Sequence, residues 1–180
     1  MVDVSTLQSL SYVAAAIGVC VAAFYYAFNL RETMKNRRVT LSMNVLQSLG
    51  KEDWQLQHVE VMSMQWSDFD DFKRKYDSSV DPESYARRHS VLLTYDFLGQ
   101  LYRFGVVDLS TFTDIWAMGA VMCWTKFKPI VEGYRGWEWP KGAFSDLEYL
   151  ANALQRRLSE SDPDFMKKLD AFIPTAGMDQ

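Results

Sequence analysis

The side chains that could do chemistry are few and scattered along the chain. There are two histidines, His58 and His89, and two cysteines, Cys20 and Cys123. None of them has the His-x-x-x-His or Cys-x-x-Cys spacing typical of a zinc site, which usually needs four ligands. His58 and Glu60 together would supply at most half of such a site. We therefore expect a partly exposed or hydrogen-bonded His58, a buried structural His89, and two cysteines that act as small apolar residues.

Three aspartates, Asp68, Asp70 and Asp71, resemble a calcium loop only superficially, because the central glycine and the distal glutamate of such a loop are missing. They are better suited to the positive end of a short helix that Ser67 would cap. The glycine-rich phosphate loop, the dinucleotide fingerprint and the nucleophile elbow are absent from the sequence. We therefore predict no catalytic residue, no metal site and no cofactor, and expect that the protein is not an enzyme.

The charges are distributed unevenly, and this predicts a membrane helix. The chain has 180 residues and a formal net charge of −4, which argues against nucleic acid as a partner. Residues 4–30 contain no charged side chain, and all 19 lysines and arginines lie at or after position 31. As a helix, residues 7–30 would extend roughly 36 Å, whereas the hydrocarbon core of a bilayer is about 30 Å thick. The segment is therefore long enough to span.

The residues that flank this segment predict its orientation. A cleaved signal peptide carries positive charge before its apolar run, but here Asp3 precedes the run. The bases Arg31, Lys35, Arg37 and Arg38 follow it. Positive residues stay on the cytoplasmic side and contact the lipid headgroups. We therefore expect an uncleaved anchor in the cell membrane, with the N-terminus outside and the C-terminal portion in the cytoplasm.

Small residues recur four apart inside the span, at Ala14, Gly18 and Ala22. In lipid, such a stripe lets helices approach closely and pack. The alternative is that alanine and glycine are simply common in membrane helices. The helix can continue beyond the bilayer, because no proline occurs before position 82. Its apolar positions there are Val39, Met43 and Leu46, which we expect to pack on the domain or on a partner.

The remaining sequence predicts helices only, over residues 52–64, 68–76 and 82–104, from 108 or 110 to 129, and over 144–158 and 163–173. We expect Val91, Tyr95, Leu98 and Tyr102 on the inner face of the central helix, widened by Leu101 and Phe104, and on the next helix Phe112, Ile115, Trp116, Gly119, Met122 and Cys123. The predicted fold is all-α. One transmembrane helix continues into a cytoplasmic bundle of about six helices, with divisions at 1–30, 31–50 and 51–180.

A predicted loop at residues 133–142 concentrates aromatic side chains. It contains Tyr134, Arg135, Trp137 and Trp139. Aromatic residues and arginine are enriched at the energetically dominant positions of protein interfaces. The loop can therefore contact a partner, or it can cover the core of its own domain. The sequence leaves both interpretations open.

The segment around the central helix resembles a known group of proteins. The residues that carry the resemblance are Arg88-His89-Ser90-Val91, Tyr95, Phe97-Leu98-Gly99, Gly105-Val106-Val107-Asp108-Leu109, Trp124, Phe127 and Ile130, with the span Leu10-Ser11-Tyr12-Val13-Ala14-Ala15-Ala16-Ile17-Gly18 and its basic flank. Together they are similar to uncharacterised prokaryotic (archaeal or bacterial) single-span membrane proteins with a helical domain of unknown function. The resemblance implies the same architecture, and it supplies no catalytic motif.

These observations favour association over chemistry. We expect a non-catalytic accessory or assembly subunit of a larger membrane complex, or a homo-oligomeric scaffold, whose partners are lipid and other membrane subunits or further copies of itself. The alternative is a membrane-anchored sensor that binds a small ligand between its helices, in a polar pocket reached by Tyr95, Tyr102 or His89. A third possibility is an enzyme that these motifs miss, which would gather carboxylates and histidine around a cavity.

Overall fold

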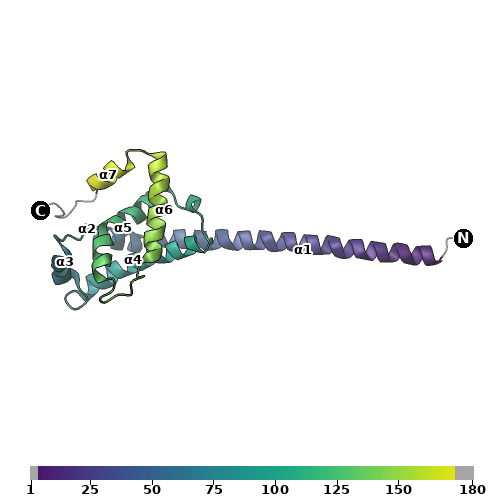
Figure 1. Ribbon diagram of the computed structural model, residues 1–180, viewed down its shortest axis with the longest axis horizontal. Coiled ribbons are helices and arrows are strands. Elements are labelled where there is room, and N and C mark those ends of the chain that lie inside the picture. The colour runs from purple at the N-terminus through teal and green to yellow at the C-terminus, as the bar shows by residue number, and fades with distance from the viewer. Residues whose placement is uncertain (1–3, 173–180) are drawn as a thin grey trace. The chain divides into compact units, whose positions relative to one another are not determined.

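The computed structural model describes residues 4–172, without the side chains of several α1 residues and of Phe172. The chain divides into two compact units, Met1–Met43 and Asn44–Gln180. Helix α1 (Val4–Leu49) makes up the described part of the first unit and enters the second. Every other element belongs to the second unit (Figure 1).

Helix α1 is long because its sequence holds nothing that would end it before Gly50. It has no proline, and the small residues of its apolar part favour the helix more than loops. Residues Leu10–Leu41 form the one helix segment in the described chain that is long and apolar enough to cross a membrane. Its side chains are exposed, Phe24 to 79 % and Val19 to 70 %. They have no packing partners within the described chain.

The second unit is helical throughout its described part, which confirms the predicted all-α class. Its helices are α2 (Glu52–Ser63), α3 (Phe69–Tyr76), α4 (Pro82–Arg103), the short η1 (Leu109–Thr111), α5 (Asp114–Tyr134), α6 (Ser145–Ser161) and α7 (Phe165–Phe172). The only strand-like feature described is an isolated bridge between Arg135 and Trp139.

Two helix starts differ from the sequence prediction. Asp68, not Ser67, caps α3, because its carboxylate accepts from the backbone N–H of Asp71 at 2.7 Å. Helix α5 begins at Asp114, since the segment after Asp108 forms only a single 3₁₀ turn. The predicted start of α4 is confirmed, with Asp81 as the cap that accepts from the N–H of Ser84 at 3.0 Å.

Pro129 lies inside α5, and the helix continues to Tyr134 instead of ending near the proline. Proline has no N–H to donate to the carbonyl four residues earlier, which usually ends or kinks a helix. Here the residues beyond it are anchored, because Ile130, Val131 and Tyr134 are all buried. The packing of this last turn against the core outweighs the missing hydrogen bond.

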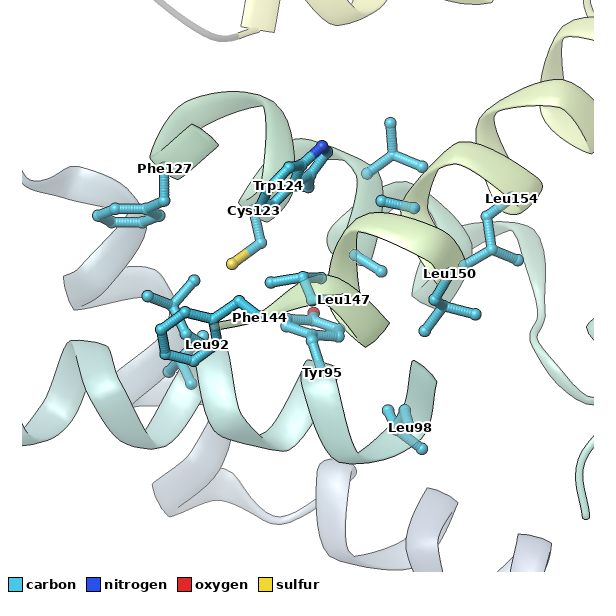
Figure 2. Close-up of a cluster of buried hydrophobic side chains, with 14 of the residues drawn as sticks. Leu92, Tyr95, Leu98, Cys123, Trp124, Phe127, Phe144, Leu147, Leu150 and Leu154 are labelled. Atoms are coloured by element: carbon cyan, nitrogen blue, oxygen red, sulfur yellow. The ribbon is translucent and has the colours of Figure 1, made fainter. Parts of the chain in front are cut away.

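The core lies between α4, α5 and α6, and α2 packs on α4. Figure 2 shows its centre, where side chains from the three helices point toward one another. Those labelled are Leu92, Tyr95 and Leu98 from α4, Cys123, Trp124 and Phe127 from α5, and Phe144, Leu147, Leu150 and Leu154 from the start and body of α6. Helix α6 is amphipathic, and its buried face carries Leu147, Leu150, Ala151, Leu154 and Leu158.

Helices α4 and α6 cross in backbone contact at Gly99. A Cβ atom at this position would lie 2.0 Å from the carbonyl oxygen of Asp146, so only glycine fits. The same crossing supplies the cap of α6. Phe144, in the left-handed region at φ 57°, offers no side-chain cap, and Asp96 of α4 accepts from the N–H groups of Asp146 at 3.0 Å and Leu147 at 2.8 Å.

Candidate functional site

The predicted packing stripe of α1 is exposed in the described structure. Ala14, Gly18 and Ala22 lie four residues apart in α1, on one side of the helix, and all are exposed. A Cβ atom built on Gly18 meets nothing within 4 Å. A second helix could therefore approach the backbone closely along this face.

The polar flank of the span is equally open. Arg31, Lys35 and Arg37 are exposed, and no ion pair within the described residues involves them. The side chain of Arg38 lies outside the described part of the chain.

Of the predicted apolar line beyond the span, the structure describes two side chains. Val39 is 55 % exposed and Met43 is 53 % exposed. The side chain of Leu46 lies outside the described part. Leu49, one turn later, is buried in the second unit, and its carbonyl accepts from Nε2 of Gln55 at 2.9 Å.

The aromatic loop belongs largely to the core of its own domain. Tyr134 is buried and stacks on Trp139, with ring centroids 4.6 Å apart, and Trp139 also contacts Phe144. Arg135 is half-buried and donates to Ala143 O at 3.0 Å and to Glu148 at 2.9 Å. Trp137 differs, because it is 60 % exposed with the ammonium of Lys73 3.8 Å from its ring centroid. The loop is thus split between core and surface.

The most unusual buried group is the guanidinium of Arg88, which is fully buried. It lies over the rings of Phe72, at 4.5 Å, and Tyr85, at 5.1 Å. It donates one hydrogen bond, from Nη1 to Tyr76 O at 3.2 Å, and its Nε and Nη2 have no partner among the described residues. Burial lowers the pKa of Arg88, because the charged form is poorly solvated there.

His89, next along α4, is half-buried, whereas the sequence predicted that it would be buried. Its ring stacks on Tyr85 at 5.4 Å and meets Trp139 and Phe144 edge-on. Its Nδ1 has no described partner, and burial and then the charge of Arg88 lower its pKa. This surrounding is aromatic, without the carboxylate that a general base or metal ligand would use for orientation.

The other histidine joins a second aromatic cluster between α2, α4 and α5. The ring of His58 stacks on Trp54 at 5.0 Å, and its Nε2 lies 3.2 Å from the hydroxyl of Tyr95. This hydrogen bond matches the expectation for His58. The hydroxyl of Tyr95 approaches Gly119, where a Cβ atom would lie 2.9 Å away, so the glycine leaves room for this hydroxyl. Burial raises the pKa of the Tyr95 hydroxyl.

Cys123, also in this core, is fully buried. Burial raises the pKa of its thiol to about 12, so the thiolate that would act as a nucleophile is scarce at neutral pH. Within the described residues, no three His, Cys, Asp or Glu side chains gather closely enough to hold a metal ion. These residues form packing contacts and hydrogen bonds instead of a reactive constellation.

A crevice of about 260 Å³ opens between α5, α6 and α7. It does not include Tyr95, Tyr102 or His89, which were predicted to reach a ligand pocket. Its walls are mainly apolar, with charged groups at the rim. The lining residues that matter here are Ile115, Met118, Met122, Phe165, Leu169 and Lys168. Ile115, predicted to face inward, is 78 % exposed at this crevice.

One surface was missed by the sequence reasoning, the outer face of α4. Leu93 is 47 % exposed, Phe97 52 % and Phe104 70 %. Phe104 was predicted to widen the inner face, but it lies seven residues after Phe97, on the same outer side, just beyond the end of α4 at Arg103. The signal was present in the sequence, because positions spaced four and three apart from Ala86 to Phe104 carry no charge.

Comparison with known proteins adds a family. The family model described as "Domain of unknown function (DUF4760)" matches residues 12–154, which cover the apolar helix and most of the second unit. No curated protein and no solved structure matches the chain. The match spans far more than half of the sequence, from the start of the apolar segment into α6. The chain therefore belongs to the DUF4760 family, whose domain combines this N-terminal helix with the helical unit that follows it.

Proposed function

We propose that this protein is a non-catalytic accessory or assembly subunit of a larger membrane protein complex and acts through helix packing. The observation that carries this proposal is that large apolar side chains stay exposed on several elements of the helical unit, among them Val59 on α2, Phe97 on α4 and Ile115 on α5. Monomeric soluble domains rarely leave a contiguous apolar patch open without a use for it. Such a face is typical of a protein interface.

The proposed topology is a single pass, with the N-terminus outside and the helical unit in the cytoplasm. It is supported by the charge asymmetry around the apolar segment of α1, as in the single-span prokaryotic proteins that the sequence resembles. Four bases follow the apolar segment, and only Asp3 precedes it among charged residues. Because bases resist translocation, this asymmetry favours retention of the C-terminal side.

The membrane helix supplies a second contact. The exposed stripe of Ala14, Gly18 and Ala22 suits a neighbouring transmembrane helix, since close backbone approach gains van der Waals contact that lipid tails cannot match. Membrane packing and cytoplasmic packing would then act together. Linked contacts of this kind strengthen each other, because the first raises the effective concentration for the second.

The test is purification of the tagged full chain from its native membranes in a mild detergent, followed by native mass spectrometry. We expect stoichiometric membrane subunits other than this chain. In a Gly18→Ile variant their recovery should fall, while the tryptophan fluorescence of the helical unit stays unchanged. Gly18→Ala is the matched control, because it keeps the residue small. A particle that contains this chain alone would contradict the accessory role.

A second candidate is a membrane-anchored sensor, and the crevice between α5, α6 and α7 favours it. Its volume of about 260 Å³ is slightly below that of ordinary ligand pockets, and its walls would take an apolar ligand. The test is the fluorescence of an environment-sensitive apolar dye added to the protein. Binding of the dye to wild type, and its loss in Met118→Trp, would support this function. Equal dye binding by both proteins would contradict it.

A further inference from the structure

The outer face of α4 carries more than exposed apolar residues, because its positions follow a regular period. Every residue of this helix is described, and six of its exposed positions are spaced alternately four and three apart: Ala86, Ser90, Leu93, Phe97, Gln100 and Phe104. This alternation of four and three is the spacing of the a and d positions in a coiled-coil heptad. We call these six positions the α4 seam. Eighteen steps of about 1.5 Å give it a length of roughly 27 Å.

The charged residues of α4 are held away from the seam. Arg87 pairs with Glu60 of α2 and with Glu83. Arg103 pairs with Asp146 of α6 at 2.6 Å, and its guanidinium lies 4.8 Å from the ring centroid of Tyr149. The helix therefore presents an uncharged seam between two neutralised flanks. A partner helix could cover the seam without burying an ionised group. Burial of such a group would cost free energy, because the charge loses its hydration.

We propose that the α4 seam binds the α4 seam of a second copy of this chain, in antiparallel orientation and centred on Tyr95. In this register each Phe97 lies opposite Leu93 of the second copy. Each Phe104 lies opposite Ala86, and each Ser90 lies opposite Gln100. Each pair of opposed residues forms one layer of the contact. The layers thus pair a ring with a branched aliphatic chain, a large side chain with a small one, and a hydroxyl with an amide.

The orientation follows from this pairing. A parallel arrangement would place each residue against its own copy, so that two Ala86 residues leave a void at one end and two Phe104 rings crowd the other. Protein interfaces at their centre are packed as densely as interiors, with buried polar groups hydrogen-bonded. In the antiparallel register, the side chains of the layers that contain a ring occupy similar volumes, and Ser90 and Gln100 can hydrogen-bond to each other.

The occupant is a second copy because the seam complements itself. In a two-fold symmetric contact, the same surface of both subunits is used, so each residue must fit the residue that the symmetry places opposite it. All six positions of the seam meet this requirement in the antiparallel register. Common anchoring by α1 would confine two copies to one membrane and so favour their encounter. In this respect the inference rests on the proposed function, in which the helical unit serves association.

Cysteine cross-linking of the full chain tests the register directly. Two proteins are made in a Cys20→Ala background, one with Ser90→Cys and one with Gln100→Cys, each with its own tag. Both replaced positions are exposed, so folding should be unaffected, and the native Cys123 is buried. After co-expression, a short thiol-specific cross-linker is added to membranes, and the products are read by size and by tag.

We expect efficient cross-linking only between the two different proteins, at least about tenfold above that of either protein alone. In the antiparallel register, identical positions at 90 or 100 lie ten residues apart along the seam, roughly 15 Å, beyond the reach of a short linker. Equal cross-linking of each protein with itself would overturn the orientation. A yield that stays at the level of a Val59→Cys control, exposed on α2, would overturn the α4 contact.

A disrupting variant supplies the second measurement. Phe97→Asp places a charge at the centre of the seam and should reduce cross-linking between Ser90→Cys and Gln100→Cys about tenfold or more, as loss of a central aromatic anchor does. Ile115→Asp, at a more exposed apolar site of α5, is the matched control and should leave the yield unchanged. Unchanged yield in Phe97→Asp would contradict the proposal.

These outcomes separate the two proposals. Foreign subunits in the purified particle without α4 cross-linking would leave the accessory role standing and overturn the seam contact. Cross-linking in a particle that contains this chain alone would support the seam contact and contradict the accessory role. A clean monomer without cross-linking would overturn both.

Discussion

The span of α1 and the outer face of α4 show the same exposure of apolar side chains but differ in what that exposure means. Phe28 in the span is 63 % exposed, and Phe97 on α4 is 52 % exposed. In a bilayer, an exposed phenylalanine is in its preferred solvent, and no further contact is needed to explain it. In water, the same ring exposes apolar area that burial against a partner would stabilise. The comparison teaches that exposure identifies an interface only after the solvent is known.

The two units also use glycine differently, and this gives the largest expected effect. Gly99 lies where α4 touches the backbone of α6, whereas Gly18 has open space around it. We expect Gly99→Val to lower the free energy of unfolding of the helical unit by about 4 kcal/mol or more, or to prevent folding, because the clash is with backbone. Gly18→Val should leave this free energy unchanged. Urea unfolding followed by tryptophan fluorescence measures both, since all six tryptophans lie in the second unit.

The aromatic loop also contains one half-buried and one exposed residue of the same type, Trp139 and Trp137. Trp139→Ala should destabilise the helical unit by about 2–3 kcal/mol, because its ring packs on Tyr134 and Phe144. Trp137→Ala removes an exposed ring and its contact with Lys73, which is worth about 1 kcal/mol or less. The measurement is the urea midpoint of each variant by circular dichroism. Equal losses would mean that Trp137 also belongs to the core.

Removal of the buried charge of Arg88 should stabilise the helical unit, whereas Gly99→Val and Trp139→Ala should destabilise it. We expect Arg88→Met to raise the free energy of unfolding by about 1 kcal/mol, because a desolvated guanidinium with one hydrogen bond is replaced by an apolar chain of similar length. Arg87→Met is the control at an exposed ion pair, and it should change the stability little, because water and salt screen such pairs. A loss of stability in Arg88→Met would show that Arg88 has a partner that stabilises its charge.

The smallest expected effect is on pH dependence. Burial lowers the pKa of both His58 and His89 below their ordinary value near 6.5. The unfolded chain therefore binds protons first, and stability is lost as the pH falls below about 6.5 toward the folded-state values. We expect the urea midpoint to fall between pH 7.5 and 5.5, and to fall less in His58→Gln. An equal fall in that variant would exclude His58 as a cause.

The sequence predicted the helices of the second unit because each shows a regular apolar period and clear boundaries. Asp81-Pro82 and Gly105 are local signals, and the structure confirms them. The α3 cap moved by one residue, since Ser67 and Asp68 both carry suitable oxygens. The outward direction of Phe104 could have been predicted, because it follows Phe97 by seven residues, which is two helical turns.

The site was less predictable than the fold. A charge-free span is visible in composition alone, and so is the stripe of small residues within it. Gly99 and Asp96 gain their roles only when α6 lies against α4, and the bond of Tyr95 to His58 joins residues 37 positions apart. The α4 seam is visible in the sequence as uncharged positions four and three residues apart, on the side of the helix opposite its buried face.

The cap of α6 has a consequence for the order of folding. Its N-terminal amides are satisfied by a carboxylate 50 positions earlier in the chain, Asp96 of α4, instead of by a neighbour. A helix start without a local cap gains stability only when its distant partner is in place. The first turn of α6 should therefore form late and cooperatively with α4 docking. During synthesis this order is natural, because α4 leaves the ribosome before the segment that it caps.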